Sequence, residues 1–257
     1  MLPTDFLYQF DQRAIGLGLL VMLMLATELG FRRGRAVAAS LPEASRAQLS
    51  TLQGAMIGLL ALLLGFSFAL SESRYEARRE LVVGESNAIG STYLRSRMLG
   101  EPFQTEVAKL LREYVDARIE YFETNGAKAA VDKGEQLLAK LWSQAIAAVA
   151  KNPSPSPTGL FVASLNELID FNSKRTAARQ NHVPEIVLWL LFFVAIGAMA
   201  LVGHGCGVGK RRELPHTVTV ALILSFVIVV IMDLDRPGQG AIQVSQASLL
   251  ALRDLIK

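Results

Sequence analysis

Cysteine and histidine are scarce in this sequence, which holds one Cys and 3 His in 257 residues. A lone Cys206 excludes an internal disulfide framework and a four-cysteine zinc site. His204 and His216 lie near Cys206, but the chain provides no fourth ligand at a zinc-like spacing. The sequence therefore predicts no metal site and no cofactor.

An excess of charge of one sign is also missing, because 26 Lys and Arg are nearly balanced by 23 Asp and Glu. A formal net charge of +3 leaves no basic footprint for nucleic acid, so no nucleic-acid partner is predicted. Phosphate loops, dinucleotide fingerprints and nucleophile–base motifs are absent as well. These absences predict that the protein is not an enzyme.

Long apolar runs are what the sequence has instead, within a composition that is 51% hydrophobic. The hydrocarbon core of a bilayer needs about 20 consecutive apolar helical residues. Four runs approach that length, and the second carries no charge at all. We therefore predict an integral membrane protein, with the lipid bilayer as one of its partners. The runs cover residues 14–31, 52–70, 184–202 and 217–234.

The segment between the second and third runs is charged and has helical periodicity. Apolar residues recur at helical spacing from Phe103 to Phe122 and again from Leu137 to Val149, and no alternating strand pattern occurs. The predicted fold is all-α, with four transmembrane helices and a helical extramembrane domain between helices two and three. We expect the second span to continue as a rod towards Met98, and a proline-rich loop at 151–159. The predicted parts are 1–70 (first transmembrane pair), 71–182 (helical domain), 183–234 (second pair) and 235–257 (amphipathic tail).

Cations in the short loops predict an orientation in the bacterial inner membrane. Arg32, Arg33, Arg35 and Arg46 follow the first span, and Lys210 to Arg212 lie between the third and fourth. Short cationic loops favour the cytoplasm, which would leave both termini and the middle domain extracytoplasmic. Arg74, Arg78, Lys174 and Arg175 near spans two and three oppose this orientation. The first run lacks a basic leader, so it is expected to remain as a span.

Small residues form a stripe along one face of the second span, at intervals of three and four residues. Such a stripe lets another helix approach closely in lipid, where packing drives association. The partner helix belongs either to the same subunit or to a neighbouring one. The helix-packing candidates are Gly54, Gly58, Ala61, Gly65 and Ala69.

The opposite face of the same helix carries leucines, then hydroxyls, then charges. This order suits a water-filled vestibule behind an apolar constriction, so these residues are candidates for lining a pore. The alternative is structural: Ser67 bonds back to a carbonyl, and the arginines pair with nearby Glu or reach the head groups. The pore-lining candidates are Leu60, Leu63, Ser67, Ser71, Arg74, Arg78 and Glu85.

Five sequence blocks carry a resemblance to a known family: 65–70, 74–75 with 78–79, 85–90 with 92–95, 165–170 with Arg175, and 233–237 leading to Gly240 and 244–246. In this order relative to four spans, they resemble the bestrophin-like domain family of bacteria and plants. Ser86 departs from the alanine usual in the family. The matching motif residues Asn87, Asp233, Asp235 and Arg236 are expected to have structural roles. Asp233 does not begin a calcium loop, because Pro237 and Val244 occupy two ligand positions.

The resemblance implies a function that composition cannot supply. True bestrophins are homopentameric ion channels with both termini in the cytosol, which contradicts the orientation predicted from the loop cations. We therefore expect an oligomeric, bestrophin-like channel for inorganic ions, a pentamer, with the second transmembrane helix lining the pore. The alternative is a non-conducting oligomeric membrane scaffold or sensor whose helical domain binds a partner. A channel needs a ring of at least four subunits, whereas an anchor can be a dimer.

Overall fold

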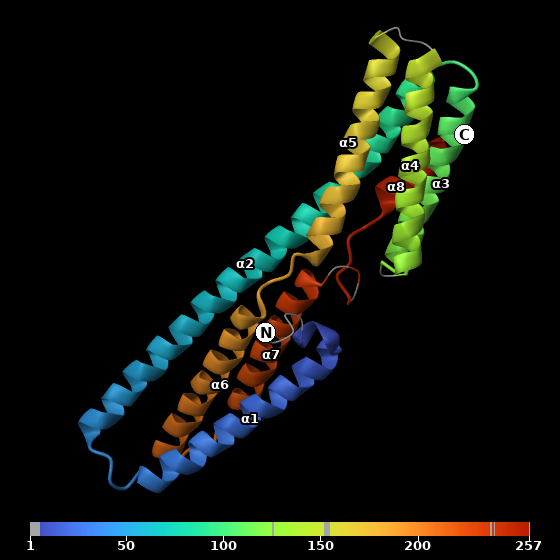
Figure 1. Cartoon of the computed structure of the whole chain (residues 1–257). Coiled ribbons are helices and arrows are strands. Elements are labelled where there is room, and N and C mark those ends of the chain that lie inside the picture. The colour runs from blue at the N-terminus through green and yellow to red at the C-terminus, as the bar shows by residue number, and fades with distance from the viewer. Residues whose placement is uncertain (1–5, 125, 152–154, 237, 239, 257) are drawn as a thin grey trace. The chain divides into compact units, whose positions relative to one another are not determined.

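The structure of the chain is a computed structural model that describes residues 6–124, 126–151, 155–236, 238 and 240–256. Over these residues the regular elements are all helices, with no strand, which confirms the all-α fold (Figure 1). A short 3₁₀ helix, η1 (Leu7–Gln9), precedes eight α-helices. They are α1 (Gln12–Val37), α2 (Glu43–Ser96), α3 (Phe103–Glu123), α4 (Lys128–Lys151), α5 (Pro155–Gln180), α6 (Glu185–Val208), α7 (Leu214–Asp235) and α8 (Ala247–Leu255).

The chain forms two compact units. The first contains residues 1–73 and 182–236, and the second contains residues 74–181 and 237–257. The division falls inside α2, a 54-residue helix without interruption. The helix therefore continues beyond the second span, as expected. It is continuous because no Pro, which would remove a backbone hydrogen bond, lies between Glu43 and Ser96.

Four stretches in the described chain are long and apolar enough to cross a membrane. They are α1, α2, the stretch Ser156–Val208 that contains α6, and α7. This confirms the expected four-span membrane architecture. The spans form because long apolar helices satisfy every internal backbone polar group without water. The side of the membrane on which the termini lie stays a prediction.

In the first unit, α1 lies against both α6 and α7 (Figure 1). Glycines at four-residue spacing bring α1 and α6 into backbone contact. A Cβ added to Gly30 or Gly34 would collide with the carbonyl oxygen of Ala200 or His204. On α6, a Cβ at Gly203 would collide with the carbonyl of Thr27. This is the close approach that paired small residues permit in lipid.

The second unit packs α3, α4, α5 and α8 around the far part of α2. Leu111, Leu141 and Phe161 come from three of these helices and are fully buried in one apolar core. The C-terminal helix α8 adds Leu249 and Leu252 to the same core. Helix α8 is thus part of this unit. A helix this short is not stable alone in water, and burial of its apolar face in the core stabilises it.

One predicted boundary was wrong. The proline-rich segment 151–159 was expected to be a loop throughout, but α5 begins at Pro155 and α4 continues to Lys151. Proline is compatible with the first turn of a helix, where its missing N–H has no intrahelical acceptor. Residues 152–154 of this segment lie outside the described residues.

Candidate functional site

The two faces of the membrane part of α2 differ sharply in exposure. Leu60, Ser67 and Ser71 are buried within the chain, at 3%, 4% and 0% exposure. Leu63 is half-buried. All five predicted helix-packing residues are exposed on the other face: Gly54, Gly58, Ala61, Gly65 and Ala69. The polar face of α2 therefore points into protein, and the face open to other molecules is the one with small residues.

This arrangement bears directly on the predicted pore residues. Ser67, Ser71 and Glu85 face protein in the single chain, so a pore-lining role for them stays a prediction without support from their burial. Arg74 is half-buried, and its Nη1 donates to Oδ1 of Asn181 at 3.0 Å. Helical periodicity assigned these residues to two faces, but it could not say which face packs against the rest of the chain.

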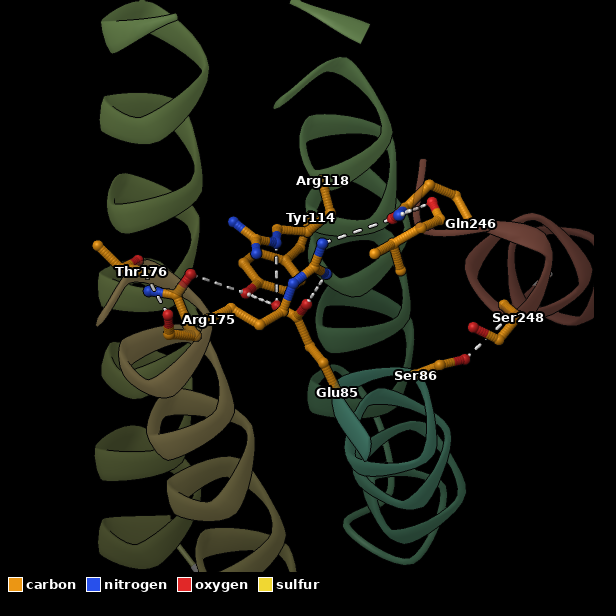
Figure 2. A network of polar contacts seen from close by, with 10 residues as sticks. Glu85, Ser86, Tyr114, Arg118, Arg175, Thr176, Gln246 and Ser248 are labelled. Carbon is orange, nitrogen blue, oxygen red and sulfur yellow. Dashed lines mark hydrogen bonds and ion pairs between the residues drawn. The ribbon is translucent and has the colours of Figure 1, made fainter. Parts of the chain in front are cut away.

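The second unit contains a buried charge network centred on Glu85 of α2 (Figure 2). Nε of Arg118 on α3 lies 3.0 Å from Oε1 of this carboxylate, and Arg175 on α5 forms an ion pair with Oε2. The hydroxyl of Tyr114 donates to Oε1 at 2.6 Å. Three helices are thus held together by one carboxylate with no exposed surface.

The network changes the proton affinity of its members. Burial alone would raise the pKa of Glu85, but the attraction of Arg175 and Arg118 is stronger and holds that pKa below its ordinary value. Burial, and next the charge of Glu85, raise the pKa of Tyr114 well above the usual range. At neutral pH, Glu85 is therefore a carboxylate and Tyr114 a neutral donor.

Arg175 also connects the network to the C-terminal segment. Its Nη2 donates to Oε1 of Gln246 at 3.4 Å, just before α8 (Figure 2). Ser86, the neighbour of Glu85, donates to the carbonyl of Ser248 at 3.0 Å. Sequence reasoning found Glu85 and the Arg175 motif but missed Arg118, which lies among apolar residues at helical spacing. A cation inside such a stripe was the available signal, since buried charges need partners.

A second polar cluster lies at the end of α7, in the first unit. Asp235 accepts hydrogen bonds from the hydroxyl of Tyr8 and, at 2.8 Å, from the backbone N–H of Val183. Arg236 donates to the carbonyls of Leu7 and Phe10 at 2.8 Å each. The motif residues thus fasten the N-terminal segment and the start of α6 to α7.

Two further motif positions can be placed. Gln12 donates to Oδ1 of Asp233, so this carboxylate also has a partner within the chain. Asn87 is exposed on α2. Within the part of the chain that the structure describes, no three His, Cys, Asp or Glu side chains gather as metal ligands. What the buried arginines and carboxylates can do chemically is to form ion pairs and bind groups of opposite charge.

These features define a class: a helical membrane protein with four candidate spans and a helical unit stabilised by buried ion pairs. The sequence model of the Bestrophin-like domain matches residues 21–249, and the chain belongs to that family. A search of curated proteins found no match.

Three solved structures resemble the fold, all of a bacterial Bestrophin homolog from Klebsiella pneumoniae. A single-substitution variant aligns with a TM-score of 0.66 at 15% identity, covering 93% of this chain and 94% of that one. The structure phased with zinc aligns with a TM-score of 0.64 at 15% identity and 94% coverage of both chains. At this identity the likeness establishes the shared fold.

Proposed function

We propose that this protein is an oligomeric ion channel in which α2 lies beside the ion path, with a pentamer as the favoured assembly. Family membership supports the proposal, and the exposure of α2 carries it. Only 17% of the apolar window of α2 is buried, compared with 39% for α1 and 44% for α7. A span that its own chain covers so little is available to other copies.

The small-residue stripe supports this use of α2. A Cβ added at Gly54, Gly58 or Gly65 would meet no atom within 4 Å. Four glycines of α1 and α6 are, by contrast, already in backbone contact between these helices: Gly30, Gly34, Gly203 and Gly207. We propose that the stripe packs against α2 of a neighbouring copy, and that the buried polar face supports α2 from behind.

Mass and flux measurements test the proposal together. The full-length protein is purified in detergent, its particle mass is measured with detergent subtracted, and the particles are reconstituted into liposomes loaded with an ion-sensitive dye. A ring of at least four copies that conducts is the expected result. A dimer, or a larger ring without flux, would instead support the scaffold or sensor.

A pair of matched substitutions tests the role of the stripe. Gly58→Leu places a large side chain on the proposed contact, and Gly18→Leu makes the same change on an open part of α1. Gly58→Leu is expected to reduce both assembly and flux at least tenfold, whereas Gly18→Leu leaves them unchanged. Equal behaviour of the two variants would refute the assigned contact.

A further inference from the structure

A cavity of about 60 Å³ lies within the second unit, next to the charge network. It is bounded by α2, α3, α5 and the segment before α8. This volume has room for about four water molecules, or for a ligand with a similar number of heavy atoms. Arg175 belongs both to the network and to the lining of the cavity.

The lining has two chemically different parts. Three guanidinium groups supply positive charge: Arg78, Arg175 and Arg179. Leu81, Val82 and Phe122 supply an apolar wall. A pocket that combines an apolar surface with a few converging polar groups is typical of small-molecule sites.

Among the described residues of this unit, the charges around Glu85 do not balance. Arg118 is 4% exposed and the side chain of Arg175 is 9% exposed, and these two guanidinium groups share one carboxylate. Among the described residues of the unit, Glu85 is the only buried carboxylate. Buried charge of one sign is costly unless opposite charge lies close, so the free energy of this unit would fall on binding an anion.

The hydrogen bonding of Arg118 and the pKa of Arg175, the two arginines beside Glu85, agree with that imbalance. Nη2 of Arg118 is buried without a hydrogen-bond acceptor among the described residues. Burial lowers the pKa of Arg175 below its ordinary value despite the attraction of Glu85, and the charge of Arg118 lowers it further. Burial alone would lower the pKa of Arg118 too, but Glu85 and the neighbouring groups together outweigh it and raise that pKa, so Arg175 is the cation that the single carboxylate stabilises less.

We propose that this cavity binds a small organic carboxylate. Guanidinium groups form short, paired hydrogen bonds to the two oxygens of a carboxylate, which suits the cationic side of the cavity. The hydrocarbon part of the ligand lies against the apolar wall, which offers nothing to a fully hydrated inorganic anion. Carboxylate binding is a proposal separate from ion conduction, although Arg78 of the lining is also one of the predicted pore-lining residues.

Calorimetric titration of the full-length protein in detergent tests the site, with propionate as the probe at constant ionic strength. Propionamide has nearly the same shape without the charge, and inorganic phosphate and chloride test for an unselective cationic patch. Propionate is expected to bind, propionamide to show no binding, and the two inorganic anions to bind at least tenfold more weakly. Absence of propionate binding, or equal binding of phosphate, overturns the proposal.

Three variants locate the binding. Arg179→Gln removes a cation from the lining, and Ala178→Leu fills the cavity without changing charge. Each is expected to weaken propionate binding about tenfold or more. Arg97→Gln removes an exposed cation of the same unit outside the cavity and should leave the affinity unchanged. Native elution and melting are checked for each variant, and unchanged affinity in both lining variants overturns the assignment.

Discussion

Replacing Glu85 by Gln is the sharpest test of the charge network. The amide keeps the shape of the side chain and can still accept from Tyr114, so packing is conserved. It removes the negative charge that faces Arg118 and Arg175, whose side chains are 5% and 9% exposed. Removing one partner of a buried ion pair costs about 3–5 kcal/mol, because the remaining charge has no compensation.

This free-energy loss predicts a fall in melting temperature on the order of 10 °C. Thermal unfolding of the purified full-length protein, followed by circular dichroism in detergent, measures the shift. Glu80→Gln is the matched control, since Glu80 is an exposed carboxylate on the same helix and its loss should change stability by less than about 0.5 kcal/mol. A Glu85→Gln variant that melts with the control would refute the reasoning.

The same residue predicts a dependence of stability on pH. The pKa of Glu85 is lowered in the folded protein, so the unfolded chain binds more protons in the acidic range and stability rises with pH there. The stabilisation is complete above the unfolded pKa of about 4.3 and is lost as the pH falls through the lower folded value. In the Glu85→Gln variant, the melting temperature should therefore depend less on pH between about pH 5 and pH 3 than it does in wild type. Melting curves recorded over a series of pH values measure this difference.

Two further substitutions test the contacts of the first unit. Gly203→Leu should cost about 3 kcal/mol or more, because its side chain would collide with the backbone of Thr27, and detergent melting against Gly18→Leu measures the difference. Asp235→Ala should cost about 1–3 kcal/mol, because it leaves the buried N–H of Val183 without its acceptor. Faster amide hydrogen exchange at Val183 would confirm that origin, and exchange as slow as in wild type would contradict it.

The predictable parts of the fold are those that depend on the pattern of neighbouring residues in the sequence. The four apolar runs, the uninterrupted α2 and the amphipathic helices α3 and α4 follow from hydropathy and from the placement of Gly and Pro. The blocks around Glu85 and Asp233 were also enough to identify the family. The start of α5 was missed, because Pro155 is compatible with either a loop or a first helical turn.

The candidate site could be predicted only in part, because its partners are far apart in the chain. Glu85 and Arg175 are separated by 90 positions, and no sequence period links them. Tyr114 read as an apolar core residue, although its hydroxyl completes the network. The four-residue spacing of Gly30 with Gly34, and of Gly203 with Gly207, was a usable signal for the α1–α6 contact that was not recognised.

The sequence by itself determined that this protein is a helical membrane protein of a particular family, because hydrocarbon thickness and helix periodicity act on consecutive residues. Only the tertiary structure decided that the polar face of α2 points into protein and its small residues outwards. Periodicity assigns residues to a face, but a face becomes buried only when another helix lies against it. That choice depends on the summed packing and ion pairing of distant segments.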